Sequence, residues 1–160
     1  MDRQVVGKTH LAIALGIEVI EAGFSVYFIN ASTLIDRLKK AYHEDKLDEL
    51  LRRLAKHQLL IIDEMGYLPF DSDAAYCFFQ LISRRYGETS TIITSNKSYG
   101  AWGEIFQDHV TAAAILDRIL HHCITINIKG ESYRLKERGK VGILTTRRRG
   151  ELQVGFEKSR

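Results

Sequence analysis

Gly7, Lys8 and Thr9 have the types and spacing needed to bind phosphate. They precede a helix pattern in MDRQVVGKTHLAIALG and match the second half of the loop G-x-x-x-x-G-K-[ST]. In that loop backbone N–H groups wrap the phosphates, lysine neutralises them and the hydroxyl binds Mg²⁺. The first glycine of the pattern would be residue 2, which is Asp2. Taken alone, the three residues also fit an ordinary turn and helix cap.

A pair of carboxylates strengthens the phosphate interpretation. Asp63 and Glu64 end the apolar run LLIIDE, which has the pattern of a strand buried on both faces. At the carboxyl edge of a parallel sheet, Asp63 can bind Mg²⁺ through water and Glu64 can polarise an attacking water. The alternative is a solvated strand end. We favour the functional role because the distance from Lys8 along the chain suits a phosphate-binding sheet.

A third polar group follows the next apolar strand, STIITSN. Asn96, with Thr94 or Ser95 as substitutes, is placed to contact a γ-phosphate or the attacking water. As a turn residue Asn96 needs no ligand, and this alternative has equal weight when the residue is considered alone. The order of the three groups along the chain makes the combination specific.

Two arginines are candidates for contact with the same phosphates. Arg118 lies near the end of a helix pattern after that strand, where it can reach the nucleotide of a neighbouring subunit. The alternatives are an ion pair with Asp117 or a charge at the helix C-terminus. Arg134 is a candidate second phosphate sensor within its own subunit, and a surface arginine packed along Tyr133 is as good an interpretation.

The elements that must position these groups alternate along the chain. Apolar residues at helical or continuous spacing predict helices over 8–22, 32–42 with a cap at Ser32, 47–57, 74–87 and 112–122, and strands over 25–30, 59–64, 90–96 and 123–128. This alternation predicts a parallel three-layer α/β domain, with 123–128 as its last parallel strand. Residues 141–146 and 151–156 flank the sequence RRRG and are interpreted as a hairpin.

Composition indicates one cytoplasmic globular domain. The chain has 160 residues and a formal net charge of +3, too small to demonstrate a nucleic-acid partner. No apolar run approaches the roughly 18 residues of a membrane span. We expect Cys77 and Cys123 to be reduced, since neither has metal-type spacing. The pair Arg84 and Arg85 is interpreted as a solvated helix end, with an interface role as the lesser alternative.

The residues so far described resemble a known family. The stretches VGKTHLAIALG, LLIIDEMGYLPF, STIITSNKSYGAWGEIFQD, AAAILDRILHH and GESYRLKE, in that order, resemble the IstB-like transposition helper ATPases of the IstB/DnaC group. The resemblance implies a three-layer P-loop NTPase of the AAA+/ASCE type over residues 1–137, followed by a basic tail of unknown role over 138–160. It also implies these roles: Gly7, Lys8 and Thr9 as Walker A, Asp63 and Glu64 as Walker B, Asn96 as sensor one, Arg118 as arginine finger and Arg134 as sensor two.

The resemblance further implies ATP and Mg²⁺ as cofactors. The implied partners are duplex DNA bound with little sequence preference, a transposase of the same insertion sequence, and further copies of the chain. Members of this group have a first strand and a complete glycine-rich loop ahead of the GKT residues, and this sequence has neither. The first strand lies between the sensor-one strand and the last strand, so its absence opens the sheet and leaves backbone groups unpaired.

The departure at the loop sets the expected activity. We expect a truncated insertion-sequence remnant, or a start codon inside a longer reading frame, that binds ATP weakly and hydrolyses it negligibly. The intact family form converts ATP and water to ADP and phosphate. The alternatives are a catalytically inactive DNA-binding or oligomerisation module and a fragment of a DnaC-like helicase loader.

Overall fold

The computed structural model describes residues 7–129 and 153–157. At its centre is a three-stranded sheet in the order β1-β2-β3, formed by β1 (Val26–Asn30), β2 (Leu59–Met65) and β3 (Ser90–Ser95). Both strand pairs are parallel. The apolar run that opens β2 is buried on both faces, as a central parallel strand requires. The predicted α/β class with a parallel sheet is confirmed.

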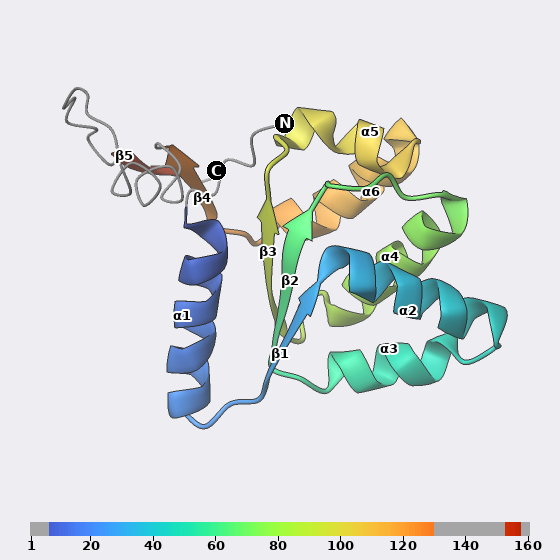
Figure 1. Ribbon diagram of the computed structural model, residues 1–160, viewed down its shortest axis with the longest axis horizontal. Helices are drawn as coiled ribbons and strands as arrows, with labels where there is room; N and C mark the ends of the chain where they lie inside the picture. Colours follow the sequence, from blue (N-terminus) through green and yellow to red (C-terminus); the bar gives the residue numbers. More distant parts are fainter. Residues whose placement is uncertain (1–6, 130–152, 158–160) are drawn as a thin grey trace, which may run out of the picture.

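Helices cover the two faces of the sheet unequally (Figure 1). One helix, α1 (Lys8–Glu21), lies against one face. The opposite face is covered by α2 (Ala31–His43), α3 (Leu47–Ala55), α4 (Ser72–Arg85), α5 (Trp102–Phe106) and α6 (His109–Leu120), with a 3-10 turn at Tyr99–Ala101 before α5. None of the helices in the described part of the chain is long and apolar enough to cross a membrane.

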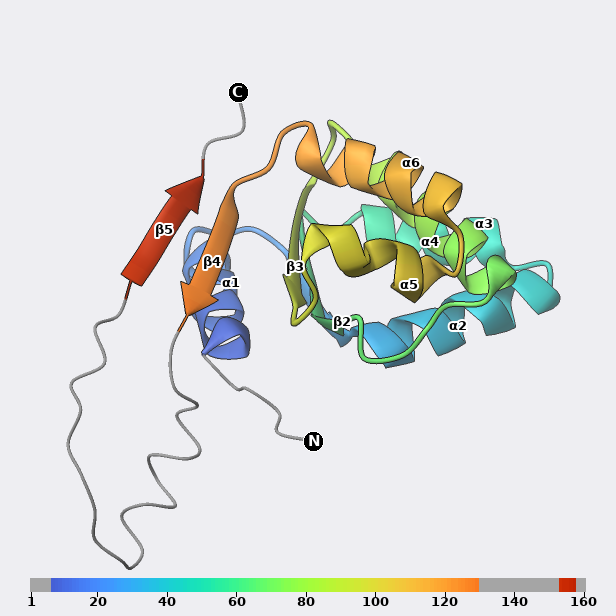
Figure 2. The same ribbon diagram turned by 90° about the horizontal axis from the view of Figure 1, so that it is seen from above.

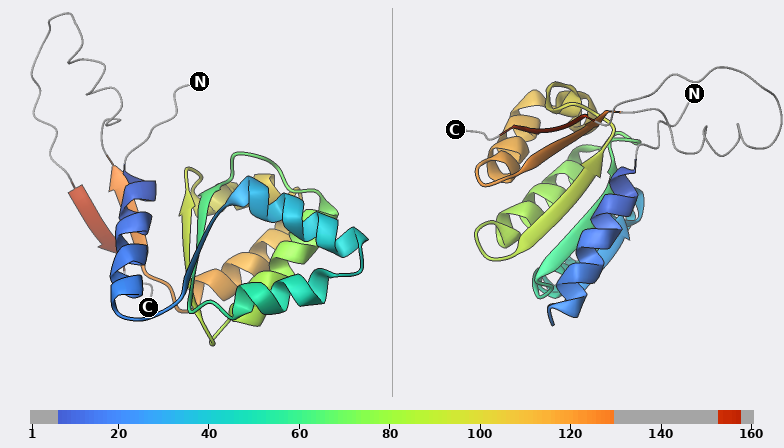
Figure 3. Two further views of the ribbon diagram at one scale, coloured as in Figure 1. Left: turned by 60° about the horizontal axis from the view of Figure 1, so that its bottom comes forward. Right: turned by 90° about the vertical axis from the view of Figure 1, so that its left-hand side faces the viewer.

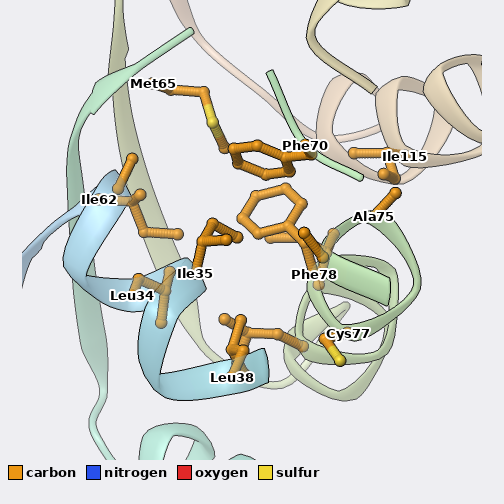
Figure 4. Packing of buried hydrophobic residues seen from close by; sticks show 14 of the residues in the cluster. Leu34, Ile35, Leu38, Ile62, Met65, Phe70, Ala75, Cys77, Phe78 and Ile115 are labelled. Atoms are coloured by element: carbon orange, nitrogen blue, oxygen red, sulfur yellow. The ribbon is translucent and has the colours of Figure 1, made fainter. Parts of the chain in front are cut away.

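The larger core lies between the sheet and the five helices (Figure 4). Its centre is aromatic: the ring centroids of Phe70 and Phe106 lie 5.1 Å apart edge to face, and those of Phe78 and Phe106 lie 5.9 Å apart. Trp102 is also buried there. The short helix α5 was not predicted, and burial of its aromatic side chains holds it on the core.

A smaller core lies under α1. Ala12 packs there with Leu59 and Ile61 of β2. A Cβ on Gly16 would lie 2.9 Å from Ile61 Cδ1 and 3.6 Å from Val26 Cγ1. The small residues Ala12 and Gly16 therefore allow α1 to lie close to the sheet. The first turn of α1 is thereby held near the end of β2.

The prediction that residues 123–128 form a fourth parallel strand of the sheet is wrong. The strand β4 (Thr125–Lys129) pairs antiparallel with β5 (Gln153–Glu157) in a separate two-stranded sheet. In the described ranges no strand bridges β3 and β4, so β4 has no parallel neighbour to hydrogen-bond. The second half of the predicted hairpin is a strand, but its partner is β4. The first half, 141–146, lies outside the described residues.

The expectation of a solvated Arg84–Arg85 pair is half wrong. Arg84 is on the surface and its Nη2 lies 2.6 Å from Asp48 Oδ1. Arg85 is only 2% exposed and points inward at the end of α4. Its guanidinium donates to the carbonyl oxygens of Leu54, His57 and Ser90 and to Thr91 Oγ1. Helix periodicity places Arg85 on the buried face, where these acceptors replace water.

Candidate functional site

The carboxyl edge of the sheet and the start of α1 meet at Asp63. The side chain of Asp63 is 5% exposed, and Thr9 Oγ1 donates to its two oxygens at 3.0 and 3.1 Å. Strand β2 ends at this edge and α1 begins there, because the helix lies antiparallel over the sheet (Figure 1). The structure thus brings together Thr9 and Asp63, which lie 54 positions apart in the sequence.

Thr94 of β3 completes the hydrogen bonding around the carboxylates. Its hydroxyl donates to Asp63 Oδ1 at 2.5 Å and accepts from the backbone N–H of Glu64 at 3.0 Å. Asp63 therefore accepts hydrogen bonds from two hydroxyls, one from Thr9 of α1 and one from Thr94 of β3. Such bonds fix the orientation of a buried carboxylate.

Glu64 has an unusual backbone conformation. Its φ is 62°, and the register between β2 and β3 shifts between Ile62 and Met65. A bulge of this kind re-aims side chains at the end of a strand. A non-glycine residue at positive φ costs roughly 1–3 kcal/mol and is found disproportionately at functional sites.

Asn30 holds the side chain of Glu64, and sequence reasoning missed it. Its Nδ2 donates to Glu64 Oε2 at 2.8 Å, while its Oδ1 accepts from the backbone N–H of Ser32 at 3.0 Å. Asn30 is thus the N-cap of α2, in place of the predicted Ser32. A signal was present: Asn30 ends the run SVYFIN, and parallel strands end at one edge, where it pairs in register with Asp63.

The N-terminus of α1 fits an anion. Gly7 precedes the helix with a φ of 80°, a left-handed conformation that favours glycine. Space is not the reason for glycine here, because an added Cβ would meet no atom within 4 Å. The first turn contains no acidic residue, and no side chain caps it. Lys8 forms no ion pair with any described residue. Free N–H groups, the helix dipole and this lysine together favour phosphate.

The same edge suits a magnesium ion that is shared with phosphate. Among the described residues no group of three or more His, Cys, Asp or Glu side chains could hold a metal by itself. Mg²⁺ keeps several waters and commonly binds one or two protein groups together with substrate phosphates. The Thr9 hydroxyl and the Asp63 carboxylate lie 3.0 Å apart at this edge and offer oxygen atoms, the ligand type that Mg²⁺ prefers.

The predicted sensor and its substitutes have different surroundings. Asn96 lies beyond the end of β3 and is exposed. Ser95 Oγ donates to the carbonyl oxygen of Met65 at 2.8 Å. Thr94, named as a substitute, is the residue of this stretch that contacts Asp63. The assignment of Asn96 to the γ-phosphate stays a prediction.

The two predicted arginines are not part of this hydrogen-bonded group. Arg118 is half-buried in the last turn of α6, with its Cζ 4.4 Å from the ring centroid of Phe79. Its Nη1 donates to the carbonyl oxygen of Ala114 at 3.4 Å, and no ion pair joins it to Asp117 within the described ranges. Arg134 lies outside the described residues.

Comparison with known proteins identifies the family of the chain. Residues 3–141 match the model of the family described as IstB-like ATP binding protein. A relative in Pseudomonas aeruginosa, named as an ATP-binding protein of insertion sequence IS21, is 55% identical over 140 residues. A relative in Geobacillus stearothermophilus, named likewise for IS5376, is 54% identical over 133 residues. The matches cover 88% and 83% of this chain but 53% of each relative, so the chain spans about half their length.

Solved structures agree in fold. The DnaC helicase loader aligns with a TM-score of 0.57 at 23% identity, over 71% of this chain and 69% of the other. The AMPPCP-bound DnaA of Aquifex aeolicus aligns with a TM-score of 0.58 at 20% identity, over 68% and 34%. Both are AAA+ P-loop NTPases, so the predicted fold class is confirmed. With the family match over most of its length, the chain belongs to the IstB-like ATP binding proteins.

Proposed function

We propose that the edge formed by α1, β2 and β3 binds the triphosphate of ATP together with Mg²⁺. The main support is the hydroxyl–carboxylate contact between Thr9 and Asp63, beside a helix N-terminus whose Lys8 forms no ion pair with a described residue. Gly7 and Lys8 contact the phosphates, and Thr9 and Asp63 hold the ion. Family membership and the nucleotide bound to one structural neighbour support the same ligand.

Glu64 is the group we propose to polarise the attacking water. The hydrogen bond from Asn30 fixes the position of its carboxylate, and the bond from its own N–H to Thr94 holds its backbone. A carboxylate kept at a fixed place and able to accept a proton is the requirement for a general base. The reaction class is hydrolysis of ATP to ADP and phosphate.

The biological role we propose is that of a helper ATPase in insertion-sequence transposition. Support comes from the names of the relatives, which associate them with insertion sequences and ATP binding. In this role the protein assembles with further copies on duplex DNA and assists a transposase. Arg118 would then act on the neighbouring nucleotide, and Arg134 would be a sensor within its own subunit.

A second candidate is a nucleotide-independent DNA-binding or oligomerisation module. Asp2 favours it, because Asp2 occupies the sequence position at which the phosphate-binding loop has its first glycine. One lost phosphate contact costs about 1–3 kcal/mol, or roughly ten- to hundredfold in affinity. We therefore propose weak ATP binding and negligible turnover for the chain as it stands.

Ligand-dependent stability distinguishes the two candidates. A ligand that binds the folded state alone adds about 1.4 kcal/mol of stability at ten times its Kd. We expect Mg·ATP to raise the unfolding free energy at millimolar concentration, less so with EDTA present. Lys8→Ala should abolish the gain, and Lys40→Ala, the same change at an exposed lysine of α2, should retain it.

Three results contradict the proposal. They are no gain for the unaltered chain, an equal gain for Lys8→Ala, and a gain unaffected by removal of magnesium. A low-micromolar affinity would instead support the site and refute the weakening expected from Asp2. Glu64→Gln provides a further check, because it should keep the Mg·ATP gain if its role lies in hydrolysis.

A further inference from the structure

Thr94 lies opposite the bulge at the end of β2. The register between the two strands gives two residues of β2, Asp63 and Glu64, for the single residue Thr94 of β3. An extra residue of this kind loses its regular place in the ladder of backbone hydrogen bonds. Figure 3 shows β2 and β3 side by side, with their carboxyl ends at the edge where α1 begins. Thr94 is therefore the residue of β3 that faces both carboxylate residues.

The hydroxyl of Thr94 supplies the acceptor that the bulge removes from the ladder. Its oxygen accepts from the backbone N–H of Glu64 at 3.0 Å, a bond that a carbonyl oxygen of the neighbouring strand makes in a regular parallel pair. Glu64 has a φ of 62°, and a residue with a side chain keeps this conformation only where its surroundings fix it. The bond to Thr94 is one such constraint, because a partly buried N–H without an acceptor is costly.

The proton of the same hydroxyl is donated to Asp63. Thr94 Oγ1 lies 2.5 Å from Asp63 Oδ1, and the two residues are 8% and 5% exposed. A hydroxyl has one proton to donate, so in this arrangement Thr94 has none left for a phosphate. Within the described part of the chain, Asp63 Oδ2 accepts only from Thr9 Oγ1, at 3.1 Å. Asp63 thus uses Oδ1 towards β3 and leaves Oδ2 for an external ligand.

We propose that Thr94 is a positioning residue of the ATP site: its hydroxyl fixes the Asp63 carboxylate so that Oδ2 is presented to Mg²⁺, and it fixes the backbone of Glu64 in the bulge. This inference rests on the proposed function, because the ion binds together with the triphosphate. In this role Thr94 contacts neither phosphate nor ion and acts through the two carboxylates. It therefore differs from the phosphate sensor for which Thr94 was a substitute candidate.

A second side chain of β3 holds the strand beyond the bulge. Ser95 Oγ donates to the carbonyl oxygen of Met65 at 2.8 Å, one residue after the two carboxylates. Helices lie on both sides of β3, α1 on one side and α5 and α6 on the other (Figure 2). Because these contacts do not involve the Thr94 hydroxyl, its loss should alter the carboxylates and leave the strand in place.

Four variants isolate the effect of this hydroxyl. Thr94→Val and Thr94→Ala both remove it, and the second does so without placing a methyl group beside Asp63. Thr94→Ser keeps the hydroxyl. Thr91→Val is the matched control, because it removes a hydroxyl from the same strand, where Thr91 accepts from Arg85. Each variant is compared with its own urea midpoint without ligand, so a general loss of stability does not enter the comparison.

The first measurement is the stability gained from ATP with magnesium and from ATP with EDTA. The ratio of the two derived affinities is the magnesium factor. We expect the unaltered chain, Thr94→Ser and Thr91→Val to share one magnesium factor. Thr94→Val and Thr94→Ala should lower it about tenfold, the effect of losing one hydrogen bond to a charged group. Their affinity for ATP in EDTA should not change.

The second measurement needs no nucleotide. Hydrogen exchange of the Glu64 amide, followed by NMR, should be about tenfold or more faster in Thr94→Val and Thr94→Ala than in the unaltered chain, because the amide has lost its acceptor. Thr94→Ser and Thr91→Val should leave this exchange rate unchanged. A purely structural loss of stability would instead speed exchange along the whole of β2.

Three results overturn the proposal: the same magnesium factor in Thr94→Val as in Thr91→Val, a magnesium factor lowered in Thr94→Ser as well, or exchange of the Glu64 amide that does not respond to loss of the hydroxyl. If the unaltered chain gains no stability from ATP with magnesium, the proposed function fails and the magnesium role of Thr94 fails with it. If all variants share the gain of the unaltered chain, the proposed function stands and the role of Thr94 alone is refuted.

Discussion

Truncation of Arg85 should destabilise the fold far more than truncation of its neighbour. Arg85→Ala leaves the carbonyl oxygens of Leu54, His57 and Ser90 without this donor, and Thr91 Oγ1 as well. The oxygen–nitrogen distances for the three carbonyls are 2.7, 3.1 and 2.6 Å. The residue is 2% exposed, so water has little access to replace the donor.

The magnitude follows from two opposing effects. Hydrogen bonds to a charged group contribute roughly 1.5–3 kcal/mol each, and an unsatisfied buried acceptor costs about 1–3 kcal/mol. Burial of the guanidinium works against this gain, since it lowers the pKa of Arg85 to about 10. We expect Arg85→Ala to cost about 3–5 kcal/mol, a large part of the ~5–15 kcal/mol of a typical domain. The stability of Arg85→Lys should lie between those of Arg85→Ala and the unaltered chain, because one ammonium cannot reach all four acceptors.

Urea unfolding measures this difference directly. With a slope of roughly 2 kcal/mol per molar, Arg85→Ala should lower the midpoint by about 1.5 M or more. Arg84→Ala is the matched control: its exposed ion pair with Asp48 is worth about 0–1 kcal/mol, a shift of less than about 0.5 M. Equal midpoints for the two variants would refute the buried-donor reasoning.

Two further predictions concern the site and the core. Asn30→Asp keeps an oxygen to cap α2 but places a carboxylate against Glu64. The urea midpoint of this variant should therefore fall below that of the unaltered chain at pH 7.5 and approach it at pH 5. An equal deficit at both pH values contradicts the contact. Burial raises the pKa of the Cys77 thiol to about 11. Iodoacetamide at pH 8 should therefore modify Cys123 in the folded protein and reach Cys77 only in urea, as followed by mass spectrometry; similar rates for both thiols would show that the core is open.

Much of the fold followed from periodicity. The unbroken apolar run before Asp63 predicted a buried parallel strand, and helical spacing after Lys8 predicted α1, because burial on two faces or on one stripe imposes those patterns. Motif order assigned both Thr9 and Asp63 to one magnesium ion, and the two side chains are in contact. The short helix around Trp102 was missed, since a single turn has no period to detect.

Tertiary structure decided which polar residues meet. The sequence contained Asn30, Thr94, Ser95 and Asn96 as strand-end residues of similar character, but the contacts with Asp63 and Glu64 depend on register and on the bulge in β2. A shift of one residue turns a side chain to the other face of a sheet, and composition does not specify that choice.

The sequence by itself determined the longer helices, the three strands of the main sheet, their order and the types of polar residue that end those strands. Only the tertiary structure decided that Arg85 is buried and that β4 pairs with β5. The physical reason is that local pattern depends on which face of an element is apolar. Pairing and burial of polar groups depend on which distant backbone atoms are within hydrogen-bonding distance once the elements have packed.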